Sequence, residues 1–419
     1  MAVGVAELDQ LLFEIIATPE GRADPYPRYG VLRDGAPVFR SSLGPWVCTA
    51  FDDCQLVLRD HRFGKNTDDD PGRRAEERFG IGAITDEQVD YLRRRRSLLF
   101  MNPPDHTRLR GLVSKAFTPR TVEALRPAIV SLVDALLAAI PDGERFDLIS
   151  TLAFPLPVAV IGRMLGVPEA DWPRFQQIMA KVTVLLEPLI PPEDLARALE
   201  AQRELDSYFS ELVSERRRDP QDDLLSRLIE VEEGSDRLTE VELISTAVLL
   251  FGAGFETTTN LIGNATLSLL RNPDELARLR SDRDGLLRSA VEELLRFESP
   301  VQLDGREAFS EVEIAGCTIE PGSTVLTLLG AANRDPAHFT DPDRLDLGRD
   351  EGAPISFGSG IHYCLGAALA RVEGQVVLDQ MLDTFAQIEL ATDSPVWKDR
   401  ITLRGLAELP LVVHRQPPH

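Results

Sequence analysis

Hydrophobic positions recur at helical spacing through the middle of the chain and alternate at strand spacing near both ends. Helical spacing holds almost throughout residues 105–300. The clearest helical segments are Val122 to Ala139, Leu195 to Arg217 and Leu243 to Leu270. Strand-like segments lie at 37–49, 307–330 and 385–415. This pattern predicts a mainly α fold, with a helix-rich body and small β-sheets.

The chain carries no internal repeat and no low-complexity linker. Its 419 residues are 43% hydrophobic, which is enough to bury a large core. Residues 66–90 are polar and glycine-rich and predict a loop. Because nothing marks a clean boundary, we expect residues 1–419 to form a single domain.

Charge and cysteine usage narrow the class of protein. The formal net charge of -23 argues against non-specific binding to nucleic acid. A local run of four arginines, Arg93–Arg96, is expected to be a solvated helix end. The N-terminus lacks signal-peptide features, and no apolar run approaches the roughly 20 residues of a membrane span. The four cysteines form no CxxC pair, so we expect a cytoplasmic protein without disulfides or a membrane anchor.

The cysteine at position 364 stands in a distinctive sequence setting. A glycine-rich stretch, FGSGIHYCLG, leads directly into a segment with helical spacing. N–H groups at the start of a helix stabilise an anion, so we expect Cys364 to ionise there. Gly358, Gly360 and Gly366 permit tight turns and the close approach of a flat ligand. A buried core role, the commoner fate of a cysteine, is expected for the others, Cys48, Cys54 and Cys317.

A nearly continuous apolar segment at 247–262 predicts a buried central helix. Gly252 and Gly254 each cost about 1 kcal/mol relative to alanine in a helix, which indicates that something approaches the backbone closely. Glu256 and Thr257 follow in apolar surroundings, where the Thr257 hydroxyl can bond the carbonyl of residue 253 and bend the helix. Taken alone, a core threonine and a glutamate paired with a nearby arginine explain this pair better than catalysis does.

Further charged residues have spacings that place them together on helix faces. Glu293 and Arg296 are three residues apart, and His106 and Arg110 are four apart. Arg306 opens a strand-like segment. Each of these is also compatible with an ordinary surface charge, so spacing alone assigns no role.

The cysteine loop and the central segment resemble motifs of the cytochrome P450 superfamily. FGSGIHYCLG matches the signature FGxGxHxCxG at every fixed position, and AGFETT at 253–258 is similar to AGx[DE]TT. The resemblance covers most of the chain and is loose at 66–95 and 170–210. It implies the cytochrome P450 fold with bound haem b. Phe255 replaces the commoner histidine, at a non-catalytic position.

The resemblance implies a set of haem-binding residues. The thiolate of Cys364 would be the proximal ligand of the haem iron, with Phe357 and Gly366 beside it. The haem carboxylates would be held by basic side chains, namely His106, Arg110, Arg306 and His362. For His362, capping of the following helix is the simpler alternative.

The resemblance also implies roles around oxygen and substrate. Glu256 and Thr257 would form an acid–alcohol pair that delivers protons to bound oxygen, and Ala253 would flank the oxygen site. The expected lining of the substrate pocket is Leu249, Leu250, Val301, Gln302 and Leu303.

A buried structural network is implied as well. Glu293 and Arg296 match the family's ExxR motif, which pairs with an arginine from an irregular segment farther along the chain. Arg344 is the expected third member, and Arg349 is its rival.

These features imply a monooxygenase that cleaves O₂ and inserts one oxygen atom into a hydrophobic small molecule, usually as a hydroxylation. No flavin or iron–sulfur motif is visible, so electrons are expected from a separate ferredoxin and ferredoxin reductase. Arg108, Lys115 and Arg371 are candidate contacts for an acidic ferredoxin. Neither nucleic acid nor a membrane is an expected partner.

Two other classes fit parts of the pattern. A peroxide-driven haem peroxygenase would lack the acid–threonine pair, and a non-catalytic haem-binding protein would have no need of it. The intact pair Glu256–Thr257 argues against both.

Overall fold

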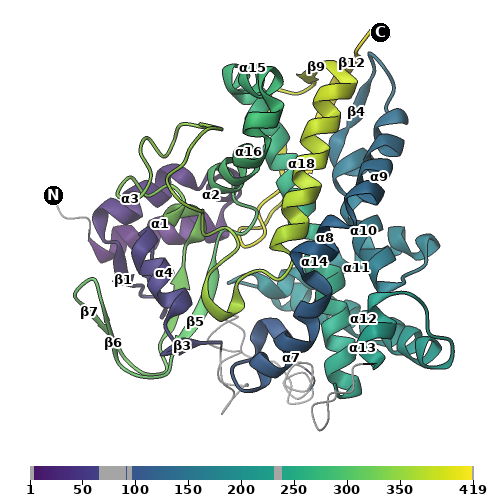
Figure 1. The fold of residues 1–419 in the computed structure, drawn as a ribbon. Helices are drawn as coiled ribbons and strands as arrows, with labels where there is room; N and C mark the ends of the chain where they lie inside the picture. Colours follow the sequence, from purple (N-terminus) through teal and green to yellow (C-terminus); the bar gives the residue numbers. More distant parts are fainter. Residues whose placement is uncertain (1–3, 66–90, 92–96, 231–237, 418–419) are drawn as a thin grey trace. The chain divides into compact units, whose positions relative to one another are not determined.

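The computed structural model describes residues 4–65, 91, 97–230 and 238–417 (Figure 1). Helices dominate these residues and the sheets are small, which confirms the predicted mainly α class. The loop predicted at 66–90 and the arginine run Arg93–Arg96 lie outside the described residues.

The chain forms two compact units, each discontinuous in sequence. The first unit comprises Met1–Phe63, Pro119–Pro157 and Glu256–His419, and the second comprises Gly64–Thr118 and Val158–Phe255. Two helices, α10 (Pro155–Leu165) and α14 (Glu240–Arg271), run from one unit into the other. The expectation of a single domain remains a prediction.

The largest sheet draws its strands from opposite ends of the chain. Its order is β1-β2-β8-β5-β3, and β2 pairs with β8 in parallel, with Trp46 opposite Val325. The other neighbours with a described register, β1–β2 and β5–β8, are antiparallel. The strands are β1 (Val38–Arg40), β2 (Trp46–Cys48), β3 (Phe63–Gly64), β5 (Asp304–Ala308) and β8 (Thr324–Thr327).

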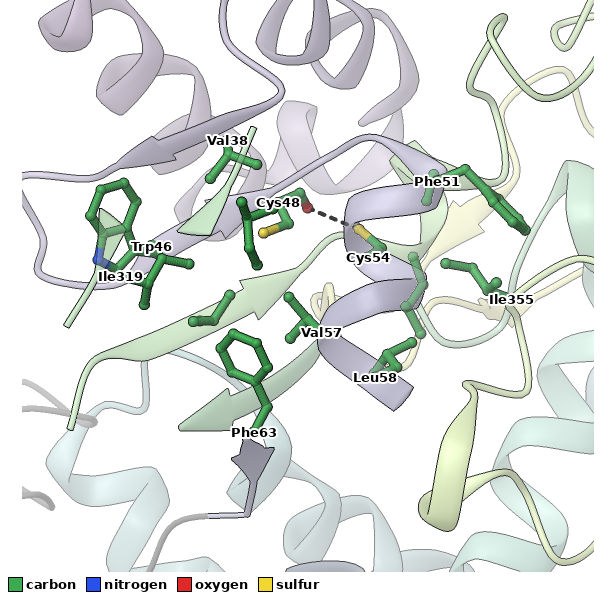
Figure 2. Close-up of a cluster of buried hydrophobic side chains, with 14 of the residues drawn as sticks. Val38, Trp46, Cys48, Phe51, Cys54, Val57, Leu58, Phe63, Ile319 and Ile355 are labelled. Carbon is green, nitrogen blue, oxygen red and sulfur yellow. Dashed lines mark hydrogen bonds between the residues drawn. The ribbon is translucent and has the colours of Figure 1, made fainter. Parts of the chain in front are cut away.

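A buried hydrophobic cluster joins this sheet to helix α4 (Phe51–Arg59) (Figure 2). Within it, the Cys54 thiol donates a hydrogen bond of 3.3 Å to the carbonyl of Cys48. Burial raises the pKa of both thiols far above the usual value, so neither ionises near neutral pH. Cys317 packs against the same cluster and is partly buried. Cys48 and Cys54 therefore have the core role expected of them, and Cys317 lies at the edge of the same core.

The remaining elements of the first unit are helices around three further small sheets, β4-β12-β9, β10-β11 and β6-β7. The helices are α1 (Val5–Ala17), α2 (Pro19–Ala23), α3 (Tyr26–Gly35), α8 (Pro119–Glu123), α9 (Arg126–Ala138), α15 (Pro273–Ser281), α16 (Arg283–Phe297), α17 (Leu329–Ala332) and α18 (Ala367–Thr384). The strands are β4 (Arg145–Asp147), β6 (Val312–Ile314), β7 (Cys317–Ile319), β9 (Phe385–Leu390), β10 (Val396–Trp397), β11 (Leu406–Glu408) and β12 (Pro410–Arg415). A π-helical turn (Ile149–Ala153) and a 3₁₀ turn (Gly360–His362) complete the unit.

The second unit is mainly helical over its described residues. Its elements are α7 (Asp105–Val113), α11 (Trp172–Val182), α12 (Pro192–Arg218) and α13 (Leu224–Glu230), with 3₁₀ turns at Leu98–Phe100, Ser114–Phe117, Glu169–Asp171 and Thr183–Leu186. Aromatic rings pack at its centre: the centroid of Phe175 lies 4.8 Å from that of Tyr208 and 4.7 Å from that of Phe251. Phe255 lies 5.8 Å from Phe251 and is almost fully buried. Phe255 thus belongs to this core.

Helix α14 is longer and more apolar than the sequence pattern predicted. It is long and apolar enough to cross a membrane, so the expectation that no such run exists was wrong. However, 67% of its apolar window is buried inside the protein, as in the core helix of a globular protein. The length of α14 is therefore weak evidence for a membrane span.

Candidate active site

The cysteine loop brings Cys364 to an exposed position just before helix α18. Two glycines shape the loop, Gly358 with a φ of +68° and Gly360 with a φ of +70°, values that side chains rarely adopt. A Cβ at Gly360 would also lie 2.4 Å from the carbonyl oxygen of Leu58, so only glycine fits there. The Cys364 N–H donates to the Phe357 carbonyl at 2.9 Å, which closes the turn.

Phe357 and Arg371 support the base of this loop. The Arg371 guanidinium lies 4.5 Å from the centre of the Phe357 ring, and it donates a 3.2 Å hydrogen bond to the Tyr363 hydroxyl. Arg371 is also paired with Glu292, and in the second unit Arg108 is paired with Glu242. Two of the three candidate docking residues therefore have their charge partly neutralised by a neighbouring carboxylate.

Helix α14 carries the acid–alcohol pair in the first unit. Glu256 is buried and Thr257 is partly accessible. The Glu256 carboxylate accepts a 2.7 Å hydrogen bond from the ammonium of Lys398. The simpler alternative considered for this glutamate, an ion pair with a nearby arginine, thus has a counterpart in the structure, with lysine as the cation.

Along the same helix, the two glycines are packed against protein side chains of the second unit. A Cβ at Gly252 would lie 2.2 Å from Cε of Met179, and one at Gly254 would lie 2.9 Å from Cγ1 of Ile161. The close approach predicted from these glycines is confirmed, and it is made by helices α11 and α10. Ala253, between them, is exposed within an otherwise largely buried helix.

The basic residues expected at haem carboxylates fall in both units. In the first, Arg306 is buried and its Nη1 donates to Asp304 at 2.6 Å, while His362 is half-buried. In the second, His106 and Arg110 share a face of α7. Burial, and then the charge of Arg110, lower the pKa of His106, so its imidazole is neutral near pH 7.

Glu293 and Arg296 form the centre of a buried network in the first unit. Arg296 Nε lies 2.7 Å from Oε2 of Glu293, and both side chains are almost fully buried. Arg349 Nε lies 3.2 Å from the same oxygen. Arg344 was the wrong choice as third member, because its side chain is 64% exposed and pairs with Asp346. Only its backbone carbonyl reaches the network, as an acceptor for Arg296 at 3.3 Å.

Two of the residues expected to line the substrate pocket are buried against other parts of the first unit. The Gln302 amide donates to the Ser299 carbonyl at 2.8 Å and to the Tyr26 hydroxyl at 3.2 Å. Leu303 belongs to the hydrophobic cluster around α1 and α3. Val301 and Leu249 are partly buried and Leu250 is buried. The pocket role of all five residues stays a prediction.

Comparison with known proteins identifies the family. The family model for cytochrome P450 matches residues 79–403, which is most of the chain. The chain belongs to the cytochrome P450 family.

Similar bacterial P450s match over nearly the whole length. The biotin biosynthesis cytochrome P450 of Bacillus subtilis (strain 168) is 38% identical, over 94% of this chain and 98% of its own. The 6-deoxyerythronolide B hydroxylase of Saccharopolyspora erythraea is 40% identical, over 93% and 96%. The crystal structure of P450BioI with a hexadec-9Z-enoic acid-ligated acyl carrier protein has a TM-score of 0.86 at 37% identity, covering 94% of this chain and 100% of that one. The chain is therefore a P450 monooxygenase, an oxidoreductase, with the P450 fold.

The donor set of the first unit fits the haem that this family uses. Cys364 offers an exposed sulfur, the soft ligand that suits iron in this setting. A Cβ at Gly366 would meet no atom of the described residues within 4 Å. The bonds of Arg306 to Asp304 and Gly305 both use Nη1, so a planar guanidinium with five donors keeps others for a carboxylate.

Sequence reasoning missed two partners of the α14 motif in this P450. The first is Lys398, far along the chain, for which the sequence carried no signal. The second is Glu373 on α18, fully buried, whose carboxylate accepts a hydrogen bond from Thr258. Within the part of the chain that the structure describes, its Oε2 has no hydrogen-bond partner. A lone acid among apolar positions of a helix was the available signal.

Glu373 makes the stability of the protein pH-dependent. Burial raises its pKa to about 8, although the Thr258 hydrogen bond opposes the rise. The unfolded chain ionises this group near 4.5, so unfolding releases a proton between the two values and stability falls as the pH rises through that window. The fall is about 1.4 kcal/mol per pH unit for one proton. The Glu373→Gln variant should lose this slope and be more stable than wild type at pH 8, as measured by urea unfolding.

The exposed acid Asp379 on the same helix provides the control for that measurement. Its side chain is half-exposed and pairs with Arg283. Asp379→Asn should keep the wild-type slope between pH 5 and pH 8. An unchanged slope in Glu373→Gln would show that Glu373 is not the titrating group.

Proposed function

We propose that this P450 hydroxylates a hydrophobic small molecule, using O₂ and electrons from a separate ferredoxin and ferredoxin reductase in the cytoplasm. One observation carries the proposal: the first unit combines an exposed thiol at Cys364, ahead of α18, with the acid–alcohol pair Glu256–Thr257 on α14. A thiolate ligand suits O₂ cleavage, and the acid–alcohol pair suits the proton delivery that O₂ cleavage requires.

Separate sets of residues would bind the haem and deliver protons. Cys364, with Phe357 and Gly366 beside it, would bind haem b, which when bound supplies the oxygen chemistry. Arg306 and His362 of the first unit would hold the haem carboxylates. Thr257 would hold a proton-carrying water at the oxygen site beside Ala253, and Glu256 would replace each proton used.

The substrate is expected to be apolar and of moderate size. Leu249, Leu250 and Val301 offer apolar side chains for its contacts. The similar proteins support this class: one solved structure holds a myxobacterial P450 with myristic acid, and another holds P450BioI with a fatty acid-ligated carrier protein. A free or carrier-bound acyl chain is therefore a reasonable first substrate to test.

The Thr257→Ala variant tests the proposal. Without the hydroxyl, proton delivery at the site would fail and electrons would be lost as hydrogen peroxide. We expect product per NADPH to fall by about a hundredfold, the lower end of the contribution of a proton-transfer group, while NADPH consumption continues. Product and peroxide would both be measured with a ferredoxin and its reductase.

Thr257→Ser retains the hydroxyl and serves as the matched variant. It should keep most of the wild-type coupling. An unchanged product yield in Thr257→Ala would contradict the role of Thr257. Product from peroxide alone, and none from NADPH, would favour the peroxygenase class.

A further inference from the structure

Lys398 connects the C-terminal segment to the acid on α14. It follows strand β10, and its backbone N–H donates to the Gly405 carbonyl at 2.9 Å. Its Nζ lies 2.7 Å from Oε1 of Glu256 and 2.9 Å from Oδ1 of Asn260. All of these residues belong to the first unit. One ammonium thus bonds two side chains one helical turn apart on α14.

The geometry of this contact depends on a close approach of two backbones. Glu256 and Asn260 are four residues apart and share a helix face. A Cβ at Gly405 would lie 2.0 Å from Oδ1 of Asn260, so glycine is needed where the turn between β10 and β11 meets α14. Asn260 is almost fully buried. The turn therefore packs in a fixed position against the helix. This packing places Lys398 next to Glu256.

Lys398 is suited to orient the acid. An ammonium has three N–H donors, and the two bonds to Glu256 and Asn260 leave one. The Lys398 side chain is 21% exposed and that of Glu256 only 10%, so the remaining donor can hold water next to a buried carboxylate.

We propose that Lys398 is a positioning residue for Glu256: it fixes the carboxylate on α14 and connects it to solvent, so that Glu256 can be reprotonated in each cycle. This inference rests on the proposed function, because it assigns Lys398 to the proton delivery of the same site. Lys398 acts through Glu256 and touches no reacting atom.

The test compares product formation by the haem-loaded enzyme with NADPH as electron source and with added hydrogen peroxide. Lys398→Met should lower product per NADPH about threefold to tenfold, a part of the contribution of the proton-transfer group it serves, with a matching rise in peroxide. The yield with added hydrogen peroxide should stay at the wild-type level, because peroxide brings its own protons. Lys398→Arg should restore most of the coupling, and Lys398→Met should add no further loss in the Glu256→Gln background.

A neighbouring ion pair provides the control, and unfolding provides a readout without turnover. Asp399→Asn breaks the pair between Asp399 and Arg22 and should leave coupling unchanged. In urea, the effects of Lys398→Met and Glu256→Gln should be non-additive, as expected for residues in contact. Wild-type coupling in Lys398→Met, or equal losses with NADPH and peroxide, would overturn the inference. A wild-type protein that forms no product either way would instead overturn the proposed function.

Discussion

Replacing Cys364 by alanine is expected to abolish substrate oxidation and the thiolate signature of the reduced, carbon monoxide-bound protein. Loss of a group that merely supports a metal ligand costs 10–100-fold in affinity or activity, so loss of the ligand itself should cost more, about a thousandfold or beyond. The visible spectrum of the reduced protein with carbon monoxide reports ligation directly, and product formation reports activity.

Cys317→Ala is the matched control for that experiment. Cys317 lies on β7, packed against the cluster of the main sheet. Its removal should leave both the spectrum and the activity at wild-type levels. If Cys364→Ala kept the thiolate spectrum, another sulfur would have to be the ligand, and the assignment of the loop would be wrong.

Replacing Glu293 by alanine is expected to cause a large loss of stability. Arg296 and Arg349 would remain buried without the carboxylate that both contact. Removing one partner of a buried ion pair typically costs about 3–5 kcal/mol. Arg296 also donates to the carbonyls of Asn333 and Pro342 at 2.7 and 2.8 Å, so the irregular segment after α17 should loosen as well. Urea unfolding and haem retention would measure the effect.

Separate replacement of Arg349 and Arg344 tests which arginine belongs to the network. Arg349→Ala should destabilise the protein by a substantial part of the Glu293→Ala effect, since its side chain is buried against Glu293. Arg344→Ala should change stability by no more than about 0.5 kcal/mol, as is usual for exposed positions. Equal effects of the two variants would contradict the network described here.

Local patterns predicted the elements well because their physical causes are local. Helical spacing at Leu195 to Arg217 corresponds to α12 (Pro192–Arg218). Alternation at 385–415 corresponds to β9 and β12, with the small β10–β11 sheet between them. The loop before α18 could be predicted because it is rich in glycine, the residue type that tight turns favour. Resemblance to one family then supplied the expected roles.

Contacts between distant segments could not be predicted in this way. Lys398 and Glu256 are separated by 142 positions, and nothing near either residue indicates the other. Arg344 and Arg349 differ by five positions, and only the backbone path decides which side chain turns inward. Gln302 and Leu303 pack against neighbours from α1 and α3, and nothing near either residue in the sequence indicates these contacts.

The parallel pairing of β2 with β8 constrains how the polypeptide can be made. Trp46 meets Val325, so β2, which pairs with β1 on its other side, lacks its β8 neighbour until most of the chain has left the ribosome. During synthesis, the apolar side chains of β1, β2 and α4 stay uncovered for a long interval, a state prone to aggregation. Chaperone supply and translation speed should therefore govern the yield of recombinant protein, and fragments that stop before residue 324 should accumulate in inclusion bodies.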